Sequence, residues 1–137
     1  MKTTVAIIII AILSMYIVVS ANPMLIQTIE ENREYLYASV GIGSSMEPHI
    51  QNGDTLVILK KESPKYTVNI GDIVVYKDDA GRTIAHRIFS ISGIEYRVKG
   101  DNTVNCEAIY EKQIIGKVIE IISHNNYIGK AVIGAML

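Results

Sequence analysis

Thr83-Ile-Ala-His-Arg-Ile-Phe89 is the stretch that decides the fold of this 137-residue chain. In an extended strand Ile84, His86 and Ile88 share one face, and the residues between them share the other. Short segments rich in Val, Ile and Tyr recur on both sides of it, as is typical of strands. They cover residues 55–59, 73–76, 94–99 and 114–122, with the central segment extending over 83–91. We therefore expect a mainly β fold.

Turn-forming residues separate these segments. Each turn supplies a residue that tolerates positive φ or a side chain that bonds its own backbone. The turns are Gly53-Asp54, Gly71-Asp72, Asp79-Ala-Gly81, Ser92-Gly93 and Gly100-Asp101-Asn102. With 49% hydrophobic residues, the chain holds enough apolar material for the core of one compact domain.

An uncharged apolar segment covers residues 3–21 at the amino terminus. As a helix it would reach about 28 Å, close to the hydrocarbon thickness of a bilayer. We expect residues 1–22 to form a single-pass transmembrane anchor with a cytoplasmic amino terminus. A cleaved signal peptide is the alternative, because Lys2 is basic and Val19-Ser20-Ala21 offers small residues before a cleavage site. The length of the run and its apolar continuation to Ile29 favour a retained anchor.

The rest of the chain divides into three parts. Residues 23–37 carry acidic and basic side chains among apolar ones, which predicts an amphipathic helix or stalk. Residues 38–124 form the β-domain. Residues 125–137 are apolar but too short to span a bilayer, so we expect a short helix at an interface or against the anchor.

Composition excludes several classes of function. Thirteen basic residues balance 14 acidic ones, so no surface for nucleic acid is indicated. Cys106 is the only cysteine, which rules out an internal disulfide. The histidines lack the spacing of a metal site, and we expect neither metal nor cofactor. We assign no catalytic duty to His49 or His124.

Ser45 is a candidate nucleophile in Gly41-Ile-Gly-Ser-Ser-Met-Glu-Pro48. A serine hydroxyl is weak unless a neighbouring base removes its proton. His86 lies on an apolar strand face, where partial burial favours the neutral imidazole that such a base requires. The alternative is a core histidine with satisfied hydrogen bonds.

A carboxylate that accepts the second imidazole N–H would fix the tautomer of the ring. Asp101 and Glu107 are the two candidates, and the sequence does not choose between them. Arg87 follows His86 on the opposite strand face, and we expect it to pair with a turn carboxylate. Met46 fits either a core position or the substrate face.

Four segments in this order resemble the successive motifs of type I signal peptidases. They are Ser45-Met-Glu-Pro48, Gly71-Asp-Ile-Val-Val-Tyr76, Ala85-His-Arg-Ile88 and Lys99-Gly-Asp-Asn102, following an amino-terminal anchor. Bacterial members carry a lysine base where this chain has His86, whereas the endoplasmic-reticulum and archaeal type carries histidine. The chain resembles the second type over residues 3–110, which implies a signal-peptidase-like β-domain.

The resemblance implies roles for the candidate residues. Ser45 would be the nucleophile and His86 the general base. The relay aspartate of the family is replaced here by Glu107, and Asp101 matches a second family aspartate in the turn. The Ser45 N–H would form the oxyanion hole with help from Gly43 or Ser44. In the family the methionine at the position of Met46 packs at the substrate face.

The resemblance also implies a setting. These enzymes remove signal peptides from secreted precursors after small residues, at the non-cytoplasmic face of the cell membrane or, in eukaryotes, of the endoplasmic reticulum. The partners would be such precursors and membrane lipid, with accessory subunits or a translocon as further possibilities. Two rivals are a non-catalytic membrane-tethered β-domain that binds or assembles other proteins, and a cytosolic self-cleaving repressor-type peptidase, which uses a lysine base.

Overall fold

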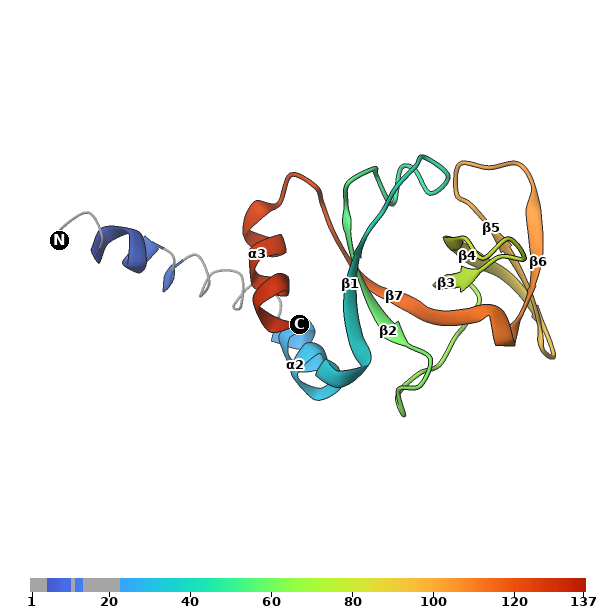
Figure 1. The fold of residues 1–137 in the computed structure, drawn as a ribbon, viewed down its shortest axis with the longest axis horizontal. Helices are drawn as coiled ribbons and strands as arrows, with labels where there is room; N and C mark the ends of the chain where they lie inside the picture. The colour runs from blue at the N-terminus through green and yellow to red at the C-terminus, as the bar shows by residue number, and fades with distance from the viewer. Residues whose placement is uncertain (1–4, 11, 14–22) are drawn as a thin grey trace.

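A computed structural model describes residues 5–10, 12–13 and 23–137. Helices α2 and α3 lie at one end of a β-sheet, and β5 and β6 lie at the other (Figure 1). The predicted anchor over residues 1–22 falls largely outside the described residues. Within it, only residues 5–10 and 12–13 are described, and these are helical. Within the part of the chain that is described, no helix has both the length and the apolar character needed to cross a membrane.

In the described part of the chain, seven strands form one sheet in the order β1-β2-β7-β3-β4-β5-β6, and every neighbouring pair is antiparallel. The predicted mainly β fold and all five predicted strands are confirmed. The strands are β1 (Leu36–Val40), β2 (Thr55–Lys60), β3 (Ile73–Lys77), β4 (Thr83–Ser92), β5 (Glu95–Lys99), β6 (Cys106–Tyr110) and β7 (Ile114–Ile122).

The sequence missed the strands β1 and β6. Their sequences, Leu-Tyr-Ala-Ser-Val and Cys-Glu-Ala-Ile-Tyr, contain Ala, Ser or Glu, which are not typical strand residues. Each occupies an outer position of the sheet, where pairing with one neighbour holds it in place. Tertiary pairing therefore overrides a weak local preference.

Strands β2 and β3 are buried on both faces, which explains their unbroken apolar sequences. In β2, Val57 and Leu59 pack with the helices, whereas Leu56 and Ile58 pack on the opposite face with Met46. β3 contributes in the same way to two clusters. The sheet therefore has apolar side chains packed on both of its faces at its centre.

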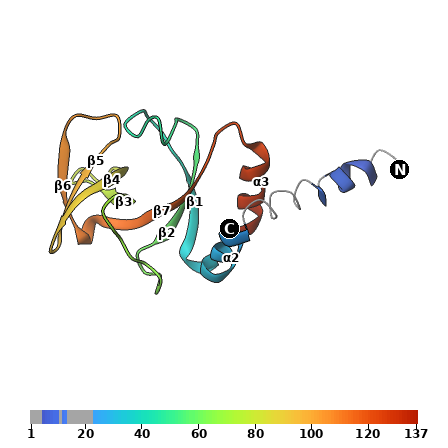
Figure 2. The ribbon, with the colours of Figure 1, turned by 180° about the vertical axis from the view of Figure 1, so that it is seen from behind.

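Helices α2 and α3 pack together at one end of the sheet (Figure 2). The predicted helix or stalk over 23–37 is α2 (Pro23–Asn32) followed by a 3-10 helix, η1 (Arg33–Tyr35), and the chain already becomes β1 at Leu36. The predicted carboxy-terminal helix is α3 (Tyr127–Met136). Ile29 of α2 and Ile133 of α3 share a buried cluster with β1, β2 and β7.

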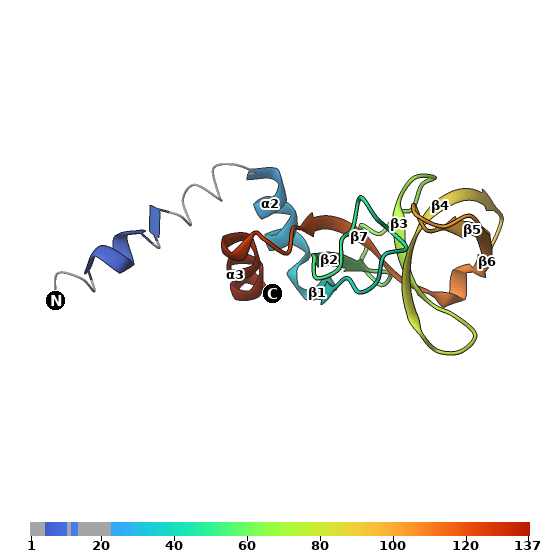
Figure 3. The same cartoon turned by 90° about the horizontal axis from the view of Figure 1, so that it is seen from above.

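Register and loop path position the site. Val74 of β3 is directly opposite His86 of β4, so Tyr76, two residues further along β3, lies diagonal to that histidine on the same face. The segment that links β1 to β2 reaches across towards β3 and β4 (Figure 3). This segment carries Ser45.

Candidate active site

Ser45 lies in the segment between β1 and β2. The turn after β5 contacts this segment through hydrogen bonds and close packing. The Asn102 N–H donates to the Ser45 carbonyl oxygen at 2.8 Å, and the Asn102 side chain donates to the Ser44 carbonyl oxygen at 3.1 Å. A Cβ on Gly100 would lie 2.5 Å from the Ser45 oxygen, so only glycine allows this approach. The turn therefore fixes the backbone of Ser45.

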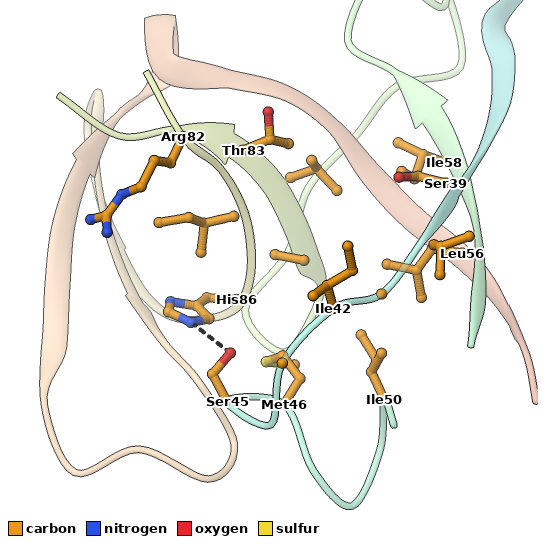
Figure 4. A pocket seen from close by; sticks show the side chains of 16 residues that line it. Ser39, Ile42, Ser45, Met46, Ile50, Leu56, Ile58, Arg82, Thr83 and His86 are labelled. Carbon is orange, nitrogen blue, oxygen red and sulfur yellow. Dashed lines mark hydrogen bonds between the residues drawn. The ribbon is translucent and has the colours of Figure 1, made fainter. Parts of the chain in front are cut away.

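The structure brings together Ser45 and His86, which are 41 residues apart in the chain. The Nε2 atom of His86 lies 3.3 Å from the Ser45 Oγ atom, and the two side chains point towards one another (Figure 4). The His86 side chain is only 8% exposed. Burial lowers the pKa of His86, although the negative charges of Glu107 and Asp101 oppose that shift. A neutral imidazole therefore faces the hydroxyl.

The other ring nitrogen of His86 faces a tyrosine that we did not single out as a site residue from the sequence. The Tyr76 hydroxyl lies 3.1 Å from His86 Nδ1 and donates to Glu107 Oε2 at 2.9 Å. The nearest Glu107 oxygen is 3.9 Å from Nδ1, outside hydrogen-bond range. Glu107 is thus close to His86, with Tyr76 bridging the two. The diagonal of a β3–β4 hairpin was the signal that could have identified Tyr76.

Asp101 has different partners from those expected of a relay carboxylate. It accepts two hydrogen bonds from the Arg87 guanidinium, at 2.8 and 2.7 Å, and its Oδ2 lies 3.0 Å from His49 Nδ1. The Arg87 hydrogen bonds hold the pKa of Asp101 below its usual value. The expectation that Asp101 could orient His86 directly is therefore corrected, whereas the predicted pairing of Arg87 with a turn carboxylate is confirmed.

An apolar cleft of about 530 Å³ opens beside the Ser45–His86 pair. One wall comes from β1 and the residues after it, and the other comes from the start of β4 (Figure 4). Met46 and Gly43 both line the cleft, and Met46 is also buried in the core, which confirms its expected core position. Ser44 is exposed, and its carbonyl oxygen is held by Asn102.

A family model described as Peptidase S24-like matches residues 9–119. The chain belongs to the Peptidase S24-like family. Membership of this family indicates a serine peptidase, which agrees with a serine hydroxyl facing a buried imidazole. Among curated proteins, the Peptidase S24-like chain has no match.

The other two histidines of this Peptidase S24-like protein, His49 and His124, each lie beside an aspartate. His124 donates its backbone N–H to Asp54 Oδ1 at 2.7 Å, and its Nδ1 lies 3.0 Å from the same oxygen. His49 joins the Ser45 segment to Asp101. Among the described residues, no group of three His, Cys, Asp or Glu side chains is placed to hold a metal ion.

Proposed function

We propose that the protein is a membrane-bound serine endopeptidase that removes signal peptides from secreted precursors. Ser45 is the nucleophile and His86 is the general base. The observation that carries this proposal is the 3.3 Å approach of His86 Nε2 to Ser45 Oγ at the edge of an apolar cleft. That distance is slightly longer than a strong hydrogen bond, as is common for a nucleophile and base without substrate.

The proposed reaction follows the acyl-enzyme route. Ser45 Oγ attacks the scissile carbonyl carbon while His86 Nε2 takes the hydroxyl proton, and the imidazolium then protonates the leaving amine. Water attacks the acyl-enzyme, again losing its proton to His86, and Ser45 leaves with that proton. Within the described residues, the hydrogen bonds of the Ser45 backbone involve its carbonyl oxygen, so its N–H is free to stabilise the oxyanion.

Two free strand edges support binding of an extended substrate. Among the described residues, β1 pairs only with β2, and residues 83–86 of β4 pair only with β3. Both edges line the cleft, through Val40 and Ala85 among others. A peptide that adds as a strand between them would hydrogen-bond to the backbone, while its side chains would enter the apolar cleft. We propose that the substrate carries small side chains there, as the signal-peptidase resemblance implies.

The proposed setting is the non-cytoplasmic face of a membrane, with residues 1–22 as the anchor. The uncharged segment 3–21 supports this placement by its length and composition. Signal peptides occupy the same bilayer, so tethering the enzyme there removes much of the entropic cost of meeting the substrate.

The proposal predicts that Ser45→Ala and His86→Ala each abolish cleavage of a separate precursor. The full chain in detergent is incubated with a precursor that carries a signal peptide, and the products are mapped by mass spectrometry. Loss of either group should reduce kcat by about 10⁴-fold or more. Ser92→Ala, an exposed serine at the far end of β4, is the matched control and should cleave like the parent.

Three outcomes would contradict the proposal. Cleavage by either alanine variant at the parental rate removes the assigned roles. Cleavage of the protein's own chain with none of the precursor favours the self-cleaving repressor type. Failure of the parent to cleave either one favours the non-catalytic β-domain.

A further inference from the structure

We infer that Tyr76 is a positioning residue, which links Glu107 to His86 and determines which ring nitrogen of the histidine carries the proton. This inference rests on the proposed function for its effect on catalysis. The structural part concerns four side chains only: Ser45, His86, Tyr76 and Glu107.

The hydroxyl of Tyr76 is the group that contacts both neighbours. It lies 3.1 Å from His86 Nδ1 and 2.9 Å from Glu107 Oε2, whereas the nearest Glu107 oxygen is 3.9 Å from Nδ1. Any orienting effect of the carboxylate on His86 through hydrogen bonds therefore passes through this hydroxyl.

Counting protons gives the tautomer. A tyrosine hydroxyl has one proton to donate, and a carboxylate can only accept. Because Tyr76 donates to Glu107, its oxygen accepts at His86, and Nδ1 must carry the N–H. Nε2 is then left with its lone pair, and it is Nε2 that faces Ser45 Oγ. This is the tautomer that accepts the serine proton.

Burial makes Tyr76 a rigid link. The residue is 0% exposed and packs within the apolar cluster of β3, β4, β5, β6 and β7. Its ring is tilted by 59° to the His86 ring, with centroids 6.0 Å apart. The Glu107 side chain is 47% exposed, so water competes for the carboxylate. The buried tyrosine transmits the influence of that charge through a fixed hydroxyl in a low-dielectric environment.

The glutamate side chain contacts the Tyr76 hydroxyl and not the His86 ring nitrogen. The signal-peptidase resemblance places an aspartate where this chain has Glu107. Here the longer side chain extends from β6 to the tyrosine hydroxyl instead of to the ring. Tyr76 and Glu107 therefore act as one unit, and their substitutions should be non-additive.

The test compares Tyr76→Phe with Tyr66→Phe in the full chain in detergent. Both changes remove one hydroxyl from a tyrosine that packs on the same cluster, but the buried Tyr66 hydroxyl has no hydrogen-bond partner in the described part of the protein. We expect Tyr76→Phe to lower kcat by about 10- to 100-fold with little change in KM. The acid limb of the pH–rate profile of Tyr76→Phe should move to lower pH, since the His86 imidazolium loses the hydroxyl that accepts its Nδ1–H. Tyr66→Phe should keep the parental values.

Nuclear magnetic resonance supplies a readout that needs no activity. Nitrogen-15 labelling of the three histidines, with His86 assigned from the His86→Ala spectrum, distinguishes a protonated from a bare ring nitrogen. We expect Nδ1–H in the parent and a mixture of tautomers in Tyr76→Phe. Nε2–H in the parent, or an unchanged His86 spectrum in Tyr76→Phe, would overturn the inference.

The two proposals can fail separately. If the parent cleaves no precursor but shows the expected tautomers, the peptidase proposal fails and the link from Glu107 to His86 stands. If Ser45→Ala abolishes cleavage while Tyr76→Phe keeps the parental kcat and pH profile, the peptidase proposal stands and the role of Tyr76 is wrong.

Discussion

At the residue scale, the properties of His86 follow from its surroundings. Burial disfavours the charged imidazole, whereas the carboxylates of Glu107 and Asp101 favour it, and burial is the larger effect. Asp101 accepts hydrogen bonds from Arg87 and lies beside His49, so its influence on the His86 ring is electrostatic. The ring is therefore neutral near pH 7 and able to accept a proton.

The pKa of His86 predicts the pH dependence of cleavage. Because burial lowers this pKa below the ordinary 6.5, kcat/KM should be fully developed at pH 7 and fall as the pH drops through a midpoint below about 6.5. The measurement is a pH profile of initial rates on a precursor. A rate that continues to rise above pH 8 would indicate a base of higher pKa, and a rate without an acid limb would contradict the histidine assignment.

At the element scale, the turn after β5 holds the candidate nucleophile in place. Gly100 allows the close approach to the Ser45 carbonyl, and Asn102 donates to the carbonyl oxygens of Ser45 and Ser44. Asp101 ties Arg87 of β4 to the same turn. One turn thus fixes both the Ser45 segment and the strand that carries His86.

Gly100→Ala should damage both stability and activity. The added Cβ would meet the Ser45 oxygen at 2.5 Å, and a backbone atom cannot move aside cheaply. We expect a loss of about 1–3 kcal/mol in the free energy of unfolding. A displacement of Ser45 by about 1 Å should lower kcat/KM by about 10²-fold.

Gly134→Ala is the matched control for that change. A Cβ at Gly134 of α3 meets no atom of the described residues within 4 Å, so the variant should keep its activity and gain about 0.5–1 kcal/mol from helix propensity. Denaturant unfolding and precursor cleavage measure both variants. Parental behaviour of Gly100→Ala would show that the turn does not constrain Ser45.

At the scale of the whole molecule, the sheet contributes to three apolar clusters formed by the described residues. The cluster around Val74 and Tyr76 supports His86 from one side, and the cluster around Met46 and Ile58 lies beneath the Ser45 segment. The third joins α2 and α3 to β1, β2 and β7, at the end of the sheet away from β5 and β6 (Figure 1). The site therefore lies where two cores meet, and the helices stabilise the sheet at a different place.

This division predicts the effect of Ile133→Ala in α3. Ile133 is 3% exposed within the third cluster, so truncation should cost about 2–4 kcal/mol of unfolding free energy. kcat/KM should change little, because the substitution is in a cluster that does not line the cleft. Ile128→Ala, on the exposed side of the same helix, should stay within about 0.5 kcal/mol of the parent. Equal stability of both variants would show that α3 does not pack as described.

The sequence by itself determined the strands whose local pattern was strong and the residues whose chemistry is distinctive. Alternation around His86 and the apolar segments of β2, β3 and β7 identified their strands, because period and β-branching act locally. Ser45, His86 and Glu107 were singled out as reactive or ionisable types in suggestive segments.

Only the tertiary structure decided which carboxylate serves which partner. Asp101 and Glu107 are six positions apart in the chain. Their local sequence does not indicate that Asp101 bonds Arg87 while Glu107 bonds Tyr76. β1 and β6 also depend on pairing with distant strands, and Tyr76 acquires its place through the register of β3 against β4. Hydrogen bonds between side chains require positions fixed to within a few tenths of an ångström, and long-range packing sets those positions.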